Sequence, residues 1–170
     1  MAWRDPFGDL DELIHRVYAY VAYRIGDGPD ADDVTSETFA RALRRRETYD
    51  AAKGPPVAWL LGIARRCISE ELAAQPIPSA TIAEAGGGVA FEDGALRRVE
   101  VARAVAKLAP RDRELVALRY GADLTARQIA ELVGMRTNAV EVALHRALAQ
   151  LRPLLAPESE EGLRAAPQPL

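Results

Sequence analysis

The side chains best suited to chemistry lie close together near the C-terminal end of this 170-residue chain. Asparagine can pair with adenine, glutamate can accept a hydrogen bond from cytosine N4, and arginine can neutralise a phosphate. Asn138, Glu141 and Arg146 supply these three types within a short stretch. The chemistry that they indicate is recognition of duplex DNA, provided that a helix holds them toward one face.

Two predicted helices would position these residues. Thr125-Ala-Arg-Gln128 has the order of a capping box, and the short helix that it opens ends at Gly134. A longer helix begins three residues later, with an apolar stripe of Val140, Leu144, Ala147, Leu148 and Leu151. A short helix, a glycine-containing turn and a longer helix are the arrangement of a helix-turn-helix.

The face opposite the stripe would meet the major groove, at about 100° of rotation per residue. We name it the DNA-reading face and expect it to comprise, with the start of the helix, Arg136, Thr137, Asn138, Glu141, Val142, His145 and Arg146. A helical hairpin that binds no ligand has the same local pattern. The pattern alone therefore leaves both interpretations open.

The charge distribution is compatible with a nucleic-acid partner, although the whole chain has a net charge of −3. Residues 96–155 hold 11 Lys and Arg against 6 Asp and Glu, whereas the segments on both sides are acidic. A basic block inside an acidic chain is typical of a DNA-contacting domain. An arginine-rich helical surface can equally be a solvated face.

Composition favours an all-α protein. Hydrophobic residues make up 49% and charged residues 28%, aromatic residues only 6%, and alanine, leucine, arginine and glutamate are frequent. The single cysteine excludes an intramolecular disulfide, and no zinc-ligand spacing occurs, so we expect no metal and no cofactor. No apolar run approaches the ~18 residues of a membrane span. The acidic N-terminus lacks the order of a signal peptide, so we expect a cytoplasmic protein.

The chain divides into two helical domains with a linker and a tail. Residues 75–95 contain two prolines, three consecutive glycines and no Lys or Arg, which predicts a flexible linker, and the proline-rich residues 156–170 predict a disordered tail. Helical periodicity predicts a three- or four-helix bundle in residues 1–74 and a helix-turn-helix domain in residues 96–155. The expected helices outside the helix-turn-helix span residues 10–25, 30–46, 57–72, 96–108 and 111–120.

An enzyme with His15, Cys67 and His145 as nucleophile and base is a weaker alternative. The three residues fall on three separate predicted helices, without a glycine-rich loop or a nucleophile elbow around them. Cys67 belongs to an apolar stripe, where a buried, inert thiol is common. We therefore expect a protein that is not itself an enzyme.

The order of motifs resembles that of sigma-70-type sigma factors. Residues 108–152, LAPRDRELVALRYGADLTARQIAELVGMRTNAVEVALHRALAQLR, resemble region 4, which reads the promoter −35 element. DADDVTSETFARAL at 30–43 resembles region 2.2, which docks on core RNA polymerase, and PVAWLLGIAR at 56–65 resembles the helix that reads and melts the −10 element. Two such regions joined by a linker are the pattern of the extracytoplasmic function (ECF) group.

The resemblance implies roles for residues of the first domain. Asp32, Asp33, Glu37 and Phe39 would contact core polymerase, although acids in a first turn also compensate a helix dipole. Promoter opening requires a base held out of the stack and a cationic rim along the strand. The loop from Tyr49 to Pro56 could supply both, with Lys53, Trp59, Arg65 and Arg66. A tryptophan in an apolar helix is by default a core residue.

The sequence departs from the family pattern at two places. The usual Thr-Val-Lys-Ser-Arg of the last helix is Ala139-Val-Glu-Val-Ala143 here, which removes two cations, adds an acid, and predicts altered −35 binding. A common glutamine of region 2.2 is Ser36. The expected partners are core RNA polymerase, promoter DNA and an anti-sigma factor. The alternative function is a stand-alone helix-turn-helix regulator that binds duplex DNA as a dimer.

Overall fold

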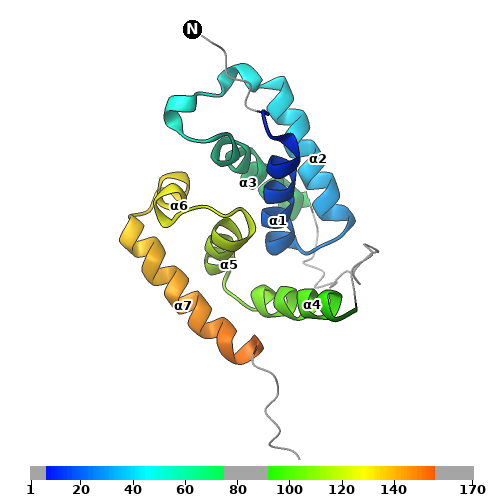
Figure 1. Ribbon diagram of the computed structural model, residues 1–170, viewed down its shortest axis with the longest axis vertical. Helices are drawn as coiled ribbons and strands as arrows, with labels where there is room; N and C mark the ends of the chain where they lie inside the picture. Colours follow the sequence, from blue (N-terminus) through cyan, green and yellow to red (C-terminus); the bar gives the residue numbers. More distant parts are fainter. Residues whose placement is uncertain (1–6, 75–91, 156–170) are drawn as a thin grey trace, which may run out of the picture.

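The computed structural model describes residues 7–74 and 92–155, which form helices and turns without any strand. The predicted all-α class is confirmed. In chain order the α-helices are α1 Leu10–Ile25, α2 Pro29–Arg44, α3 Pro56–Ala74, α4 Glu92–Ala106, α5 Pro110–Val116, α6 Ala126–Val133 and α7 Thr137–Leu155 (Figure 1). Two 3-10 turns, η1 Arg46–Thr48 and η2 Ala51–Lys53, separate α2 from α3, and a π-helical turn, η3 Ala117–Gly121, extends α5.

Helices α1 to α3 form the first half, and each packs against the other two. The Asp9 carboxylate caps α1 by accepting from the Glu12 amide, and Pro29 at the first position of α2 presets the helical φ angle. Their buried faces follow the helical period predicted for them. The core side chains of this half include Val17, Tyr20, Val21, Val34, Leu60, Leu61 and Ile68.

Helices α5 to α7 form the second half, with α4 packed on α7. The capping box at α6 is present: the Thr125 hydroxyl accepts from the Gln128 amide, and the Gln128 side chain accepts from the Thr125 amide. Gly134 ends α6 with φ 71°, a left-handed conformation that favours glycine. Both local signals therefore define the helix-turn-helix at the residues where the sequence predicts it.

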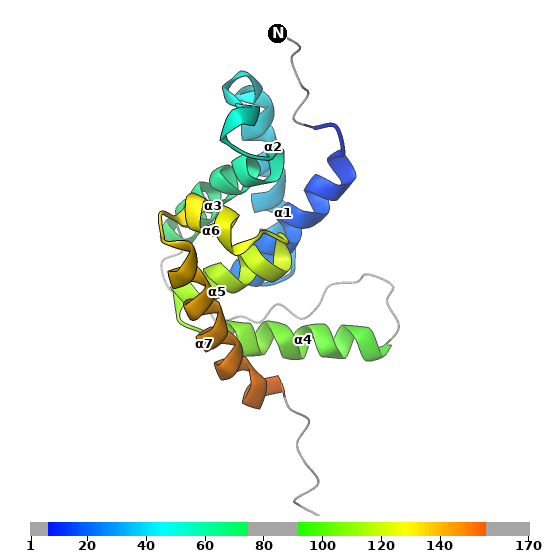
Figure 2. The same ribbon diagram turned by 60° about the vertical axis from the view of Figure 1, so that its left-hand side comes forward.

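The two halves pack against each other, which the sequence analysis does not predict. Turn η3 lies along α1, and α6 contacts α3, so that segments distant in the sequence lie side by side (Figures 1 and 2). The approach is close at Gly121, where a Cβ atom would lie 3.0 Å from the backbone carbon and oxygen of Ala19. The buried residues of the two halves consequently belong to one continuous apolar cluster.

Several helix boundaries differ from the predicted ones. Helix α2 ends at Arg44 rather than at residue 46, because the chain turns into η1 there. Helix α4 begins at Glu92, inside the segment predicted as linker. Helix α7 ends at Leu155, where the predicted tail begins, and Pro153 near its end removes only one helical hydrogen bond. The rest of the predicted linker, residues 75–91, and the predicted tail, residues 156–170, lie outside the described residues.

Candidate nucleic-acid interface

Helix α7 presents the DNA-reading face to solvent. Val140 is fully buried and Leu144 nearly so, and the helix that carries them packs against α5 and α6. The opposite side chains are exposed, and Val142 at 50% exposure is an apolar group available to a partner such as a thymine methyl. All seven predicted residues are exposed: Arg136, Thr137, Asn138, Glu141, Val142, His145 and Arg146. Ala139, which lies among them, is exposed too.

A second candidate surface surrounds the loop between α2 and α3. The Tyr49 ring lies 5.5 Å from the Trp59 ring, centroid to centroid, and the Tyr49 hydroxyl donates to the carbonyl oxygen of Gly54 at 3.2 Å. These contacts tie the loop to α3. Lys53 lies exposed on η2, with its Nζ 4.0 Å from the Asp50 carboxylate. The loop therefore carries an exposed cation on η2 and an aromatic ring, Tyr49, that packs against Trp59.

Trp59 belongs to an aromatic cluster that also comprises Phe7, Phe39 and Tyr49. The Phe7 ring lies 6.4 Å from the Trp59 ring and 6.5 Å from the Phe39 ring. Trp59 and Phe39 are only partly buried, so the cluster is neither a closed core nor a fully open surface. Phe7 thus packs near both Trp59, which is predicted to contact DNA, and Phe39, which is predicted to contact polymerase. The sequence analysis did not single it out, because an isolated aromatic residue before the first helix has no periodic signal.

Arg65 and Arg66 are adjacent on α3 but have different environments. Arg66 is exposed. Arg65 turns toward the second half, where its Nε donates to Glu114 Oε1 at 2.6 Å and its Nη1 donates to the Leu132 carbonyl oxygen at 3.0 Å. The Glu114 side chain is 14% exposed and that of Arg65 is 33% exposed. The structure thus holds Arg65 in the interface between the halves.

The acidic residues of α2 also differ among themselves. Asp32 and Asp33 are exposed in the first two turns. Glu37 accepts from Arg41 Nε at 2.6 Å and from Arg44 Nη2 at 3.3 Å. The hydrogen bond from Arg41 lowers the pKa of the Glu37 carboxyl below its ordinary value. Two carboxylates are therefore open to a basic partner, and the third is shared with arginines of its own helix.

The residues of the enzyme alternative lie in unlike environments. The Cys67 thiol is buried in the core, whereas His15 on α1 and His145 on α7 are exposed. Within residues 7–74 and 92–155, no group of three metal-ligating side chains is gathered. In the same ranges, no helix has the length and apolar character required to cross a bilayer.

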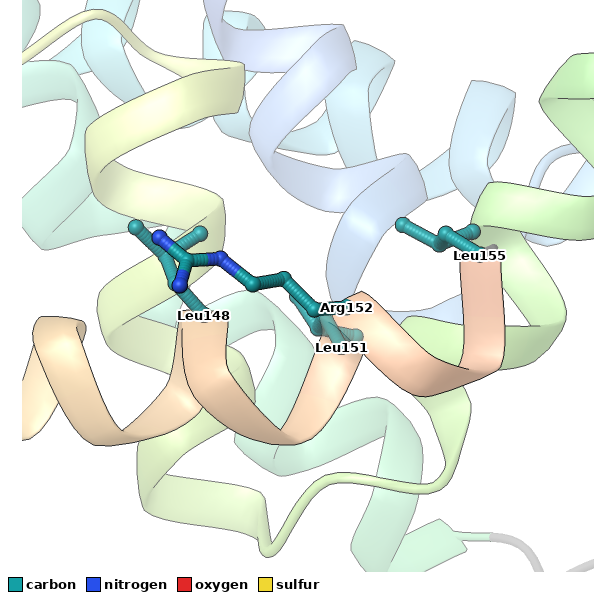
Figure 3. Close-up of a pocket in the computed structure, with 4 residues that line it drawn as sticks. All are labelled: Leu148, Leu151, Arg152 and Leu155. Carbon is teal, nitrogen blue, oxygen red and sulfur yellow. The ribbon is translucent and has the colours of Figure 1, made fainter. Parts of the chain in front are cut away.

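A shallow apolar hollow lies on the C-terminal half of α7, beyond the DNA-reading face. Leu148, Leu151, Arg152 and Leu155 line it, and the Arg152 side chain extends along the helix toward Leu148 (Figure 3). It brings together three leucines and one cation, with no acid, base or nucleophile. Its lining suits contact with another apolar surface rather than chemistry on a small molecule.

Comparisons with protein families agree with the division into two halves. Residues 10–75 match the model of Sigma-70 region 2, and residues 98–151 match that of Sigma-70, region 4. The first match covers α1 to α3, and the second covers most of α4 together with α5, α6 and most of α7. The candidate polymerase and −10 residues thus lie in one matched region and the DNA-reading face in the other.

Curated relatives are similar over most of the chain. The ECF RNA polymerase sigma factor BldN of Streptomyces coelicolor is 32% identical over 160 residues, which are 89% of this chain, and the chain spans only 61% of that relative's length. The ECF RNA polymerase sigma factor SigD of Mycobacterium bovis is 30% identical, over 84% of this chain and 73% of SigD. Among solved structures, CnrH in complex with the cytosolic domain of CnrY has a TM-score of 0.63 and 25% identity, covering 88% of this chain and 86% of CnrH.

Proposed function

This chain belongs to the ECF group of sigma-70-type RNA polymerase sigma factors, and from that membership we propose that it directs core RNA polymerase to specific promoters and helps to open the DNA. The observation that carries the proposal is the exposed DNA-reading face on a capped helix-turn-helix, in the half that matches region 4. Catalysis would belong to the polymerase, and this chain would supply recognition without an active site of its own.

The DNA-reading face supports recognition of the −35 element. Asn138 and Glu141 carry the hydrogen-bonding groups that distinguish base edges, and Arg136 and Arg146 are cations suited to the flanking phosphates. Glu141 adds a negative charge beside DNA, so the affinity of this helix depends on a cytosine that can donate to the carboxylate. We propose that this requirement tunes the preferred −35 sequence.

The loop between α2 and α3 supports a role in opening the −10 element. Strand separation needs a surface on which an unpaired base can stack and a cation that follows the backbone. The aromatic cluster and Lys53 supply these two properties within and next to one loop. Arg66 adds a second exposed cation on α3.

The exposed carboxylates of α2 support docking on core polymerase. Asp32 and Asp33 project from a helix that is fixed on its other face by Ala31, Val34 and Thr38. We propose that they meet a basic surface of the polymerase in the cytoplasm. The similar protein CnrH is in complex with another protein, the cytosolic domain of CnrY. We propose that this chain likewise binds a protein partner, an anti-sigma factor.

Transcription with purified components tests the proposal. Core RNA polymerase is incubated with a panel of promoter fragments, with and without the full chain, and permanganate footprinting detects melted thymines. Opening and transcript that depend on the chain support a sigma factor and identify its promoters together. Binding to duplex DNA without polymerase-dependent opening would instead support the dimeric helix-turn-helix regulator.

A further inference from the structure

The apolar stripe of α7 extends beyond the part of the helix that the rest of the structure covers. Val140, Ala147 and Leu151 are at most 5% exposed, whereas Leu148 is only partly buried and Leu155 is 39% exposed. Leu148, Leu151 and Leu155 are three and four positions apart, so they lie on one side of the helix and line the hollow together (Figure 3). Within the described residues, this apolar surface is left open to a further segment of protein.

Arg152 gives the hollow a positive charge. Its side chain is exposed and extends along α7 toward Leu148 (Figure 3). Among residues 7–74 and 92–155, no group forms a hydrogen bond or an ion pair with it. Glu141, the only acidic residue of α7, lies about three helical turns earlier. A segment that suits the hollow therefore carries both an apolar side chain and a carboxylate.

The chain supplies such a segment directly after α7. Residues 156–170, which lie outside the described residues, read APESEEGLRAAPQPL. Their side chains have a net charge of −2, from one arginine and three glutamates: Glu158, Glu160 and Glu161. This charge is complementary to that of Arg152. Leu163 follows the glutamates and offers an apolar side chain to the leucines of the hollow.

The length of the chain permits this segment to reach back along α7. Leu148 and Leu155 are seven positions apart, which corresponds to about 10 Å along a helix. The eight residues that end at Leu163 span up to about 26 Å when extended, enough to reverse direction and return to Leu148. Because the segment is joined to the helix, it meets the hollow at an effective concentration in the millimolar range, at which even a weak contact forms.

We propose that residues 156–170 dock in the hollow, with Leu163 against Leu148 and Leu151 and with the glutamates beside Arg152. Docking removes leucine surface from water and gives the Arg152 guanidinium an ionic partner. A protein that binds the same surface must first displace this segment, so the segment controls access to the C-terminal half of α7. The inference is independent of the proposed function, because docking takes place in the free chain.

Methyl nuclear magnetic resonance on the full chain tests the docking. Leu163→Ser removes the apolar contact and should shift the methyl signals of Leu148 and Leu151, which are 15 and 12 positions away in the sequence. The native chain should show an Overhauser contact between the methyl groups of Leu163 and Leu148. Neither observation requires DNA or polymerase, so a failure of the docking leaves the proposed function standing.

Leu170→Ser is the matched control for the apolar contact, because it makes the same change at another leucine of the same segment. It should leave the signals of Leu148 and Leu151 where they are in the native chain.

Arg152→Gln tests the charged contact. It should weaken docking roughly twofold to fivefold, as expected for an exposed ion pair. The effect is measured at the Leu163 methyl groups, whose signals should move toward those of a free peptide of residues 156–170. Arg136→Gln removes an exposed arginine at the other end of α7 and should leave the Leu163 signals unchanged.

Three results would overturn the docking. Unchanged signals of Leu148 and Leu151 in Leu163→Ser would mean that the segment does not contact the hollow. Equal shifts in Leu170→Ser would mean that Leu163 does not make the contact. Signals of Leu148 that move when the native chain is diluted would mean that a second copy, rather than the chain's own segment, occupies the hollow.

Discussion

Arg146 and Glu141 on the DNA-reading face should have separable effects on DNA binding. Arg146→Ala should weaken the binding of the polymerase complex to all promoter sequences and reduce the slope of log affinity against log salt by about one, because one phosphate contact is lost. Glu141→Ala should leave the salt slope unchanged and alter the base preference at one position of the −35 element. Affinity measured at several salt concentrations, on fragments randomised in that element, checks both results.

Gln150→Ala is the control for these substitutions, because Gln150 is exposed on the same helix and lies outside the predicted face. It should change neither the salt slope nor the base preference. An unchanged slope for Arg146→Ala together with an unchanged preference for Glu141→Ala would remove α7 from the DNA interface.

Tyr20 makes the free energy of unfolding depend on pH in the alkaline range. Burial, with a further contribution from the Glu114 charge, raises the pKa of Tyr20 to about 12. An unfolded chain has a tyrosine pKa of about 10, so between these values the unfolded state releases a proton that the folded state keeps. The Tyr20 contribution to the free energy of unfolding is therefore complete below about pH 10 and is lost as the pH rises toward 12.

Tyr20→Phe should remove this part of the pH dependence. At pH 8 the variant should unfold within about 1 kcal/mol of the native protein, because the hydroxyl that it lacks has no hydrogen-bond partner. At pH 11 it should be the more stable of the two. Urea unfolding at both pH values checks the expectation, and two proteins whose stabilities fall in parallel would refute it.

At the scale of elements, the capping box should contribute measurably to the helix-turn-helix. Thr125→Ala removes the acceptor for the Gln128 amide and should lower the free energy of unfolding by about 1 kcal/mol. Thr125→Ser retains a hydroxyl at this position and should cost less than half as much. Urea unfolding of both variants is the measurement, and equal losses would mean that the methyl group rather than the cap matters.

The elements that the sequence predicts well are those with short-range causes. The capping box spans Thr125 to Gln128, Gly134 ends α6 by its own conformational freedom, and the burial of Val140 and Leu144 follows from the period of one helix. Each feature depends on residues within a few positions of one another. The exposure of the residues assigned to the DNA-reading face was predictable for the same reason.

The features that the sequence does not predict have long-range causes. Arg65 meets Glu114 across 49 positions, and no local pattern indicates that pairing. The π-helical turn arises where the Ala122 amide bonds to the Ala117 carbonyl oxygen as η3 packs along α1. The position of Phe7 between two other rings likewise depends on how α2 and α3 cross. Tertiary packing determines all three.

At the scale of the whole molecule, alanine substitutions at two glycines in the contact between the halves should have opposite effects on stability. A Cβ atom at Gly62 on α3 would meet only the Leu132 side chain, at 4.0 Å, whereas one at Gly121 would meet the backbone of Ala19 and Tyr20 at 3.0 Å. Both substitutions to alanine favour a helix, by up to about 1 kcal/mol. Only Gly121→Ala also overpacks, which typically costs about 1–3 kcal/mol.

Gly62→Ala should therefore raise the free energy of unfolding, and Gly121→Ala should lower it. Urea unfolding of both variants is the measurement, because the backbone of α1 must shift by a few tenths of an ångström to accept a Cβ at Gly121, whereas nothing must shift at Gly62. The two positions lie in the same interface and receive the same methyl group, so the comparison isolates the close approach at Gly121. If both variants were stabilised to the same extent, η3 would not rest against α1 in solution, and the contact that occupies Arg65 would lose its support.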